Sequence, residues 1–204
     1  MSSSDVDSLV ALLDKTEQNI KRIEKISSEF VVPVLNEWRY ATRHVFTFLQ
    51  RFHTGDAALR NEEHRKATSH LKRAYFDSCD ILIDCLLSKI QGYTDDYDCY
   101  IDIAKSYIPE YSELRKLSRK AWHEHAEANN FTADMREANY ESLEAYNNAL
   151  WEFLRTLDDN AAACDSAIRK KQRSETFVIV GIMATVIGAV AGILIPILMW
   201  IFKS

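Results

Sequence analysis

Glycine and proline are scarce in this sequence, which has 5 Gly and 3 Pro among 204 residues. A sheet of many strands needs frequent turns, and these two residues are the ones that most often form them. Their scarcity argues against such a sheet and favours long helices. Hydrophobic residues make up 47% of the chain, which is enough to bury the core of one helical domain.

Cysteine is also rare, and its spacing is not that of a zinc site. The four cysteines are Cys79, Cys85, Cys99 and Cys164, which form no CxxC pair and no paired Cys/His motif. Their surroundings are mostly apolar and helical in pattern, so we expect them to be small core residues. Residues 1–7 are polar and lack the features of a signal peptide, which predicts reduced thiols.

Motifs of the common enzyme classes are missing as well. The sequence contains no GxGxxG, P-loop, GxSxG or HExxH motif, and we predict no cofactor and no metal. His123 and His125 flank Glu124, but residues two apart on a helix point about 200° apart around its axis. This triplet is therefore predicted to be solvated surface.

Negative charge dominates all but the C-terminal part of the chain. The formal charge of the whole chain is -5, and residues 169–204 carry five basic residues against Glu175, a net charge of +4. Residues 1–168 therefore carry -9. A domain this acidic argues against nucleic acid as a partner.

Charge is absent from residues 177–202. As a helix this run is about 39 Å long, against about 30 Å for the hydrocarbon core of a bilayer, so we expect one transmembrane helix with the lipid bilayer as its partner. The flanking basic residues are Arg169, Lys170, Lys171 and Arg173 before the run and Lys203 after it. This bias predicts a single-pass, tail-anchored protein of the inner (plasma) membrane, with its N-terminal domain in the cytoplasm.

Small residues recur every four positions within this run. They form two adjoining rows: Ala184, Gly188 and Gly192, and Gly181, Thr185 and Ala189. Rows of small residues allow helix backbones to approach closely in lipid, where packing drives association. Gly and Ala are also common in membrane helices by chance, but we expect this stripe to mediate self-association.

Apolar spacing predicts an all-α fold: a cytoplasmic helical bundle over residues 1–168, a basic juxtamembrane segment over 169–176 and a transmembrane helix over 177–202. Bundle helices are expected at 5–31, 33–53, 61–92, 93–107, 109–128 and from 133 onward. The stripes at 6–30 and 143–168 are heptad-like, which allows coiled-coil pairing. No Gly or Pro lies between Thr132 and Gly181, so the last helix is expected to continue into the span.

Polar residues interrupt the apolar pattern of two of these helices. Glu37 and His44 share one helix face, as do His70, Arg73 and Asp77. An antiparallel hairpin would bring Glu37 near Arg73 and Asp77, and His44 near His70. This polar cluster is either an ion-pair network that fixes helix register or a site for an anionic ligand or for catalysis.

An arginine followed by a histidine at short spacing occurs three times. The pairs are Arg39 with His44 and Arg65 with His70, both Arg-x4-His, and Arg119 with His125, which is Arg-x5-His. This spacing resembles the signature of HEPN domains, all-α bundles that often act as ribonucleases in prokaryotic defence. The resemblance implies that His and Arg of two protomers meet and handle an RNA phosphate. Candidate catalytic residues are then Arg39, His44, His70 and Arg73.

A helical bundle joined to one membrane helix also resembles the membrane effectors of bacterial antiphage systems. The resemblance implies a homo-oligomer that perturbs the bilayer, with a protein partner or a ligand as its trigger. An alternative is a tail-anchored scaffold or tether that binds partner helices through the two heptad-like stripes. A second alternative is a membrane-tethered ribonuclease of the HEPN type. The first hypothesis and the scaffold predict no enzymatic activity.

Overall fold

The computed structural model describes residues 3–27, 31–52, 56–128 and 133–201, with side chains described over 6–27, 31–51, 56–127 and 140–192. Every regular element in these ranges is helical, which confirms the all-α prediction. The elements are α1 (Ser3–Ser27), α2 (Val32–Phe52), α3 (Ala57–Tyr97), a 3-10 turn (Asp98–Tyr100), α4 (Ile101–Tyr107), α5 (Tyr111–Ala128) and α6 (Ala133–Ile201).

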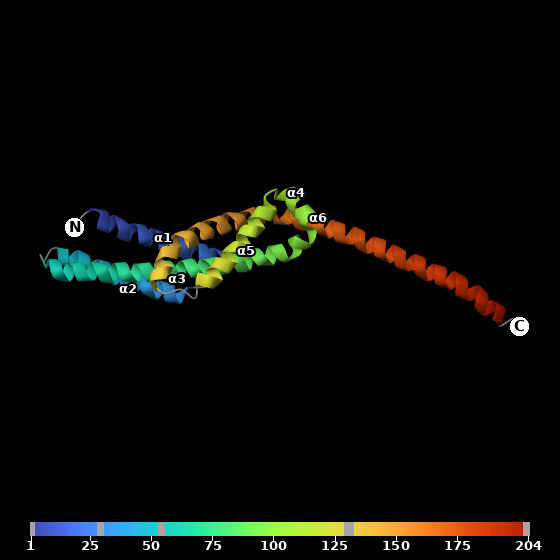
Figure 1. The fold of residues 1–204 in the computed structure, drawn as a ribbon, viewed down its shortest axis with the longest axis horizontal. Helices are drawn as coiled ribbons and strands as arrows, with labels where there is room; N and C mark the ends of the chain where they lie inside the picture. The colour runs from blue at the N-terminus through green and yellow to red at the C-terminus, as the bar shows by residue number, and fades with distance from the viewer. Residues whose placement is uncertain (1–2, 28–30, 53–55, 129–132, 202–204) are drawn as a thin grey trace.

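Helix α3 lies at the centre of the arrangement. It contacts α1, α2, α5 and α6, and α2 runs back along it as a hairpin (Figure 1). Its predicted apolar positions are fully or partly buried: Ala67, Leu71, Ala74, Ile81, Leu82, Cys85, Leu86 and Ile90. The apolar spacing in the sequence therefore identifies the face of α3 that packs against the neighbouring helices. We call α1 to α5, together with residues 133–168 of α6, the helical body.

Both ends of α3 differ from the prediction. The helix starts at Ala57 because the Asp56 carboxylate accepts a hydrogen bond from the Leu59 N–H at 3.1 Å, so Asp56, and not Asn61, is the N-cap. It also runs past Gly92 to Tyr97, where the backbone turns through the 3-10 segment into α4. A glycine inside a helix costs only about 1 kcal/mol, and the buried Ile90, Thr94 and Tyr97 on either side offset that cost.

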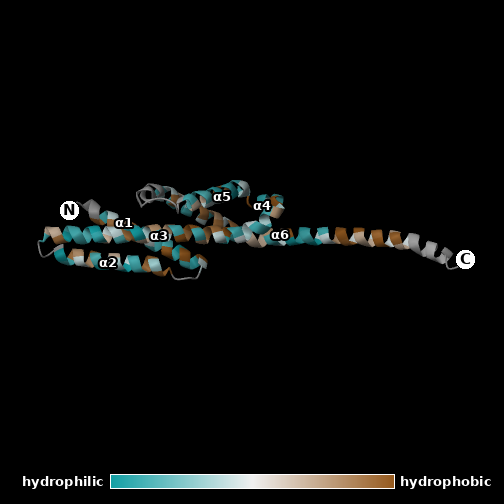
Figure 2. Ribbon diagram, turned by 60° about the horizontal axis from the view of Figure 1, so that its bottom comes forward, coloured by the Kyte–Doolittle hydropathy of each residue, from teal (hydrophilic) through white to brown (hydrophobic). Residues whose placement is uncertain are grey.

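Helix α6 is one uninterrupted helix of 69 residues. At 1.5 Å per residue it is about 100 Å long, and it leaves the helical body as a single rod (Figure 1). The prediction that the last helix continues into the apolar run is confirmed. Hydrophobic residues predominate in the part of α6 beyond the body that Figure 2 colours, and the helix contains one stretch long and apolar enough to cross a membrane.

Buried side chains and tyrosine hydroxyls attach α6 to the body. The buried residues are Tyr140, Leu143, Asn147, Leu150, Phe153, Leu154, Leu157, Cys164 and Ile168. Tyr93 donates a hydrogen bond to Asp158, and Tyr97 donates one to Asp165 at 3.1 Å. The hydrogen bond to Asp158, together with burial, raises the pKa of Tyr93 to about 12. Ile168 is the last buried side chain of α6, and every side chain from 169 to 190 is exposed.

The cysteines only partly follow the prediction of core residues. Cys79 and Cys164 are buried and Cys85 is half-buried, but Cys99 is exposed because it lies in the 3-10 turn and not on a packed helix face. Burial raises the pKa of the Cys79 thiol to about 12, which leaves it unreactive near neutral pH. Cys99 is therefore the accessible thiol among the described cysteines.

Candidate functional site

The α2–α3 hairpin brings most of the predicted polar cluster together. The Glu37 carboxylate lies 2.7 Å from Nδ1 of His70 and 3.6 Å from Nε of Arg73. Asp77 lies half-buried one turn further along α3. The His70 and Glu37 side chains are 21% and 25% exposed, so this ion-pair network lies at the edge of the hairpin interface and not in its core.

His44 joins this cluster through its ring. The His44 and His70 rings stack with centroids 5.3 Å apart and an interplanar angle of 10°. The sequence did not indicate its carboxylate partner, Glu63, which lies 2.6 Å from Nδ1 of His44. Bonds to His44 and Lys66 lower the pKa of Glu63, with the His44 hydrogen bond as the largest cause. Each histidine thus has a carboxylate at Nδ1, which orients the ring and directs Nε2 away from that carboxylate.

Arg39 is placed differently from the other candidates. Its side chain is exposed, and its guanidinium lies 5.3 Å from the centroid of the Tyr40 ring. The Tyr40 ring in turn lies 5.6 Å from that of His70. Arg39 and His44 do not share a helix face, because residues five apart are about 140° apart around the axis. Arg39 therefore reaches the cluster through Tyr40.

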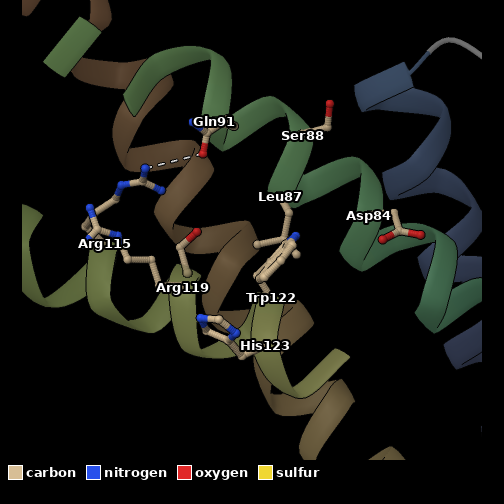
Figure 3. Close-up of a pocket in the computed structure, with 9 residues that line it drawn as sticks. Asp84, Leu87, Ser88, Gln91, Arg115, Arg119, Trp122 and His123 are labelled. Carbon is tan, nitrogen blue, oxygen red and sulfur yellow. Dashed lines mark hydrogen bonds between the residues drawn. The ribbon is translucent and has the colours of Figure 1, made fainter. Parts of the chain in front are cut away.

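A pocket of about 450 Å³ lies between α3 and α5 (Figure 3). Leu87 and Trp122 form its apolar part, and Trp122 is 56% exposed. Arg115 and Arg119 form its cationic end, with Gln91 beside them (Figure 3). The sequence prediction missed this pocket, although Arg115, Arg119 and Trp122 occur at i, i+4 and i+7 on one face of α5, a pattern that could have indicated it.

At the cationic end of this pocket, a single carboxylate accepts hydrogen bonds from both arginines. Asp98 accepts a hydrogen bond from Nε of Arg115 at 3.1 Å, from Arg119 at 3.4 Å and from the Tyr111 hydroxyl at 2.7 Å. Burial and the bond to Asp98 raise the pKa of Tyr111, so its hydroxyl remains a donor. Two guanidinium groups against one carboxylate leave a net positive charge, which suits a small anion.

His125 corrects the prediction that the His-Glu-His triplet is solvated. Its side chain is 6% exposed, with Nε2 3.1 Å from Asp84 and Nδ1 3.8 Å from Asp80. The hydrogen bond to Asp84 raises the pKa of His125 against the opposing effect of burial. The helical period correctly predicted that the side chains of His123 and His125 point in different directions. Only the packing of α5 on α3 decides which of the two is buried.

His125→Gln is expected to remove a pH-dependent part of the stability. Because folding raises the pKa of His125, its contribution is complete below the unfolded value of about 6.5 and is lost as the pH rises through the folded value. We expect the variant to lose about 1–3 kcal/mol of unfolding free energy near pH 6 and less near pH 8. Chemical denaturation in micelles at both pH values measures this. An equal loss of unfolding free energy at pH 6 and at pH 8 would contradict the raised pKa of His125.

The predicted small-residue stripe lies on the exposed part of α6. A Cβ built at Gly181, Gly188 or Gly192 meets no atom within 4 Å. The one hydroxyl of the stripe, on Thr185, donates to the Gly181 carbonyl at 2.8 Å and is thereby satisfied within the helix. Ala184 and Ala189 complete the stripe, and larger side chains such as Val186 and Val190 lie on the opposite face. None of the described helices covers this stripe.

Comparison with known proteins adds no relative. No protein-family model, no curated protein and no solved structure matches this chain.

Proposed function

We propose that this protein is a membrane-anchored effector that acts by self-association and membrane perturbation. In this proposal residues 177–202 span the inner membrane, and the helical body lies in the cytoplasm. The observation that carries it is the continuity of α6, which joins packed helices to an apolar helix without a partner in the described chain. A change in the helical body can therefore pass to the span without a flexible joint.

The glycines of the span support association between copies. Three glycines fall on one stripe of α6, although each costs about 1 kcal/mol of helix propensity relative to alanine in water. No described atom of the chain approaches them closely, so their small size serves no contact within the described chain. The transmembrane helix of a second copy can pack against these glycines, because small residues let two helix backbones come close in lipid.

Membrane perturbation follows from the composition of the span. No charged residue lies within 177–202, and one helix encloses no lumen, so a single copy does not conduct ions. Several copies that present Gly and Thr185 to a common axis can enclose one. In this proposal the activity serves bacterial antiviral defence, which is what the resemblance to antiphage membrane effectors implies. The expected cellular result is loss of the membrane potential.

Cys99 offers a direct test of the proposed orientation. It is exposed, it belongs to the helical body, and Cys79 and Cys164 are buried. We expect a membrane-impermeant maleimide to label the protein only after the inner membrane is permeabilised, and Cys99→Ser to lose that labelling. Labelling in cells whose inner membrane is intact would place the helical body on the outer side.

A scaffold role is the second candidate, and exposed apolar side chains favour it. Val6 and Val10 on α1 and Phe46 and Leu49 on α2 are each at least 41% exposed. Partner helices could cover such residues. An abundant, correctly oriented protein that leaves the membrane potential unchanged would favour this role.

A tethered ribonuclease is the third candidate, supported by the paired histidines. A carboxylate at Nδ1 leaves Nε2 of His44 and His70 to take or give a proton, and Arg73 lies beside His70. Cleavage of RNA by the purified chain, lost in His44→Gln with His70→Gln, would establish it.

A further inference from the structure

Helix α4 lies against α6 (Figure 1). A second hollow of the molecule lies between these two helices. It has a volume of about 590 Å³, with Tyr107 of α4 on one side and six residues of α6 on the other. The residues from α6 are Ala163, Ser166, Ala167, Lys170, Lys171 and Ser174. The helical period explains this wall, since Ser166, Lys170 and Ser174 are spaced by four, as are Ala163, Ala167 and Lys171.

We infer that this hollow, the α4–α6 pocket, binds the phosphate headgroup of an anionic phospholipid. The inference rests on the proposed membrane anchoring, and it assigns that anchor a lipid preference. Lysine ammonium groups and hydroxyls are the donors that a phosphate needs, and the α4–α6 pocket has two lysines, two serines and a tyrosine. Its two alanines leave the space between the lysines and Tyr107 open.

The depth of the α4–α6 pocket matches the headgroup layer. Ser174 lies three residues and Lys170 seven residues before Phe177, where the uncharged run begins. On a helix these separations are about 4.5 and 10 Å. The headgroup region extends roughly 5–8 Å beyond the hydrocarbon core on each side. The ammonium groups can therefore reach the phosphate oxygens of the adjacent leaflet.

The charges of the α4–α6 pocket are not neutralised within the chain. In the described part of the protein, neither Lys170 nor Lys171 has a carboxylate partner, whereas Arg115 and Arg119 share Asp98. The Lys171 ammonium instead lies 5.4 Å from the centroid of the Tyr100 ring, in the 3-10 turn that follows α3. Ile101 and Tyr107 of α4 are 40% and 41% exposed, as suits an interfacial segment.

Two matched double variants distinguish a specific phosphate site from general electrostatic attraction between basic residues and an anionic membrane. Lys170→Gln with Lys171→Gln removes two charges that line the α4–α6 pocket. Arg169→Gln with Arg173→Gln removes two charges from the same two turns, on residues that do not line it. General attraction of basic residues to an anionic surface, about equal for each charge, predicts the same loss for both variants. A phosphate site predicts a loss for the lysine variant alone.

The test measures lipid binding to the full chain in detergent micelles by native mass spectrometry. The probes are phosphatidylglycerol, phosphatidylcholine and inorganic phosphate. We expect the wild-type protein to prefer phosphatidylglycerol over phosphatidylcholine, the lysine variant to bind phosphatidylglycerol about 10- to 30-fold more weakly, and the arginine variant to change less than about threefold. Tyr107→Ala, which alters no charge, is expected to weaken binding by about threefold or more.

Equal losses in the two charge variants, or no preference for phosphatidylglycerol, would overturn the α4–α6 pocket as a lipid site. Displacement of the lipid by millimolar inorganic phosphate would show a site for free phosphate and overturn the lipid assignment. Carbonate extraction of vesicles that contain the same protein tests the anchor separately. A protein released by carbonate would overturn the anchor and this inference together, whereas a retained protein with equal losses would overturn only the pocket.

Discussion

Gly188→Ile combined with Gly192→Ile is expected to weaken self-association of the full chain in micelles by at least tenfold, or about 1.4 kcal/mol. The two branched side chains hold the backbones of neighbouring spans apart and remove the packing that drives association in lipid. At Cβ neither substitution meets a described atom of the same chain within 4 Å, so the helical body is expected to stay folded. Sedimentation equilibrium over a range of protein-to-detergent ratios measures the change.

Val186→Ile combined with Val190→Ile is the matched control. The spacing of four and the introduced residue are the same, but these valines lie on the face of α6 opposite the glycines. Both are at least 50% exposed, so the longer side chains meet no packed neighbour in the chain. We expect this variant to associate as the wild type does. If both variants associate equally, the glycine stripe is not the contact.

The sequence predicted the long-range organisation well where helical periodicity determines it. Most of the predicted stripe of α6 from Leu143 to Ile168 is buried, and the apolar run continues the same helix. The predicted hairpin of α2 and α3 also brings Glu37 close to Arg73 and His44 close to His70, whereas the contact of Glu37 with His70 was not predicted. These features depend on the spacing of residues along one helix or on the pairing of consecutive helices.

Features that depend on the packing of more distant helices were not predictable. Even within the α2–α3 hairpin, the sequence did not indicate the contact of Glu63 with His44. The burial of His125 and the pocket beside Trp122 arise because α5 folds back onto α3. Apolar spacing on α5 does not specify the partner helix, since no short connection fixes the pairing of α5 with α3.

Loss of the membrane potential is the second large effect that we expect. Cells that express the full chain should lose most of their potential, because spans that associate through the glycine stripe open a path for ions. The Gly188→Ile and Gly192→Ile double variant should leave the potential near that of uninduced cells. The valine double variant should depolarise as the wild type does.

The most direct test of the proposal is the membrane potential of bacterial cells that contain equal membrane amounts of these three proteins. A potential-sensitive dye reports it after induction, and immunoblots of the membrane fraction establish equal abundance. The account predicts depolarisation by the wild type and the valine variant, and none by the glycine variant. An unchanged potential in all three, or equal depolarisation by all three, would contradict an effector that acts through self-association of its span.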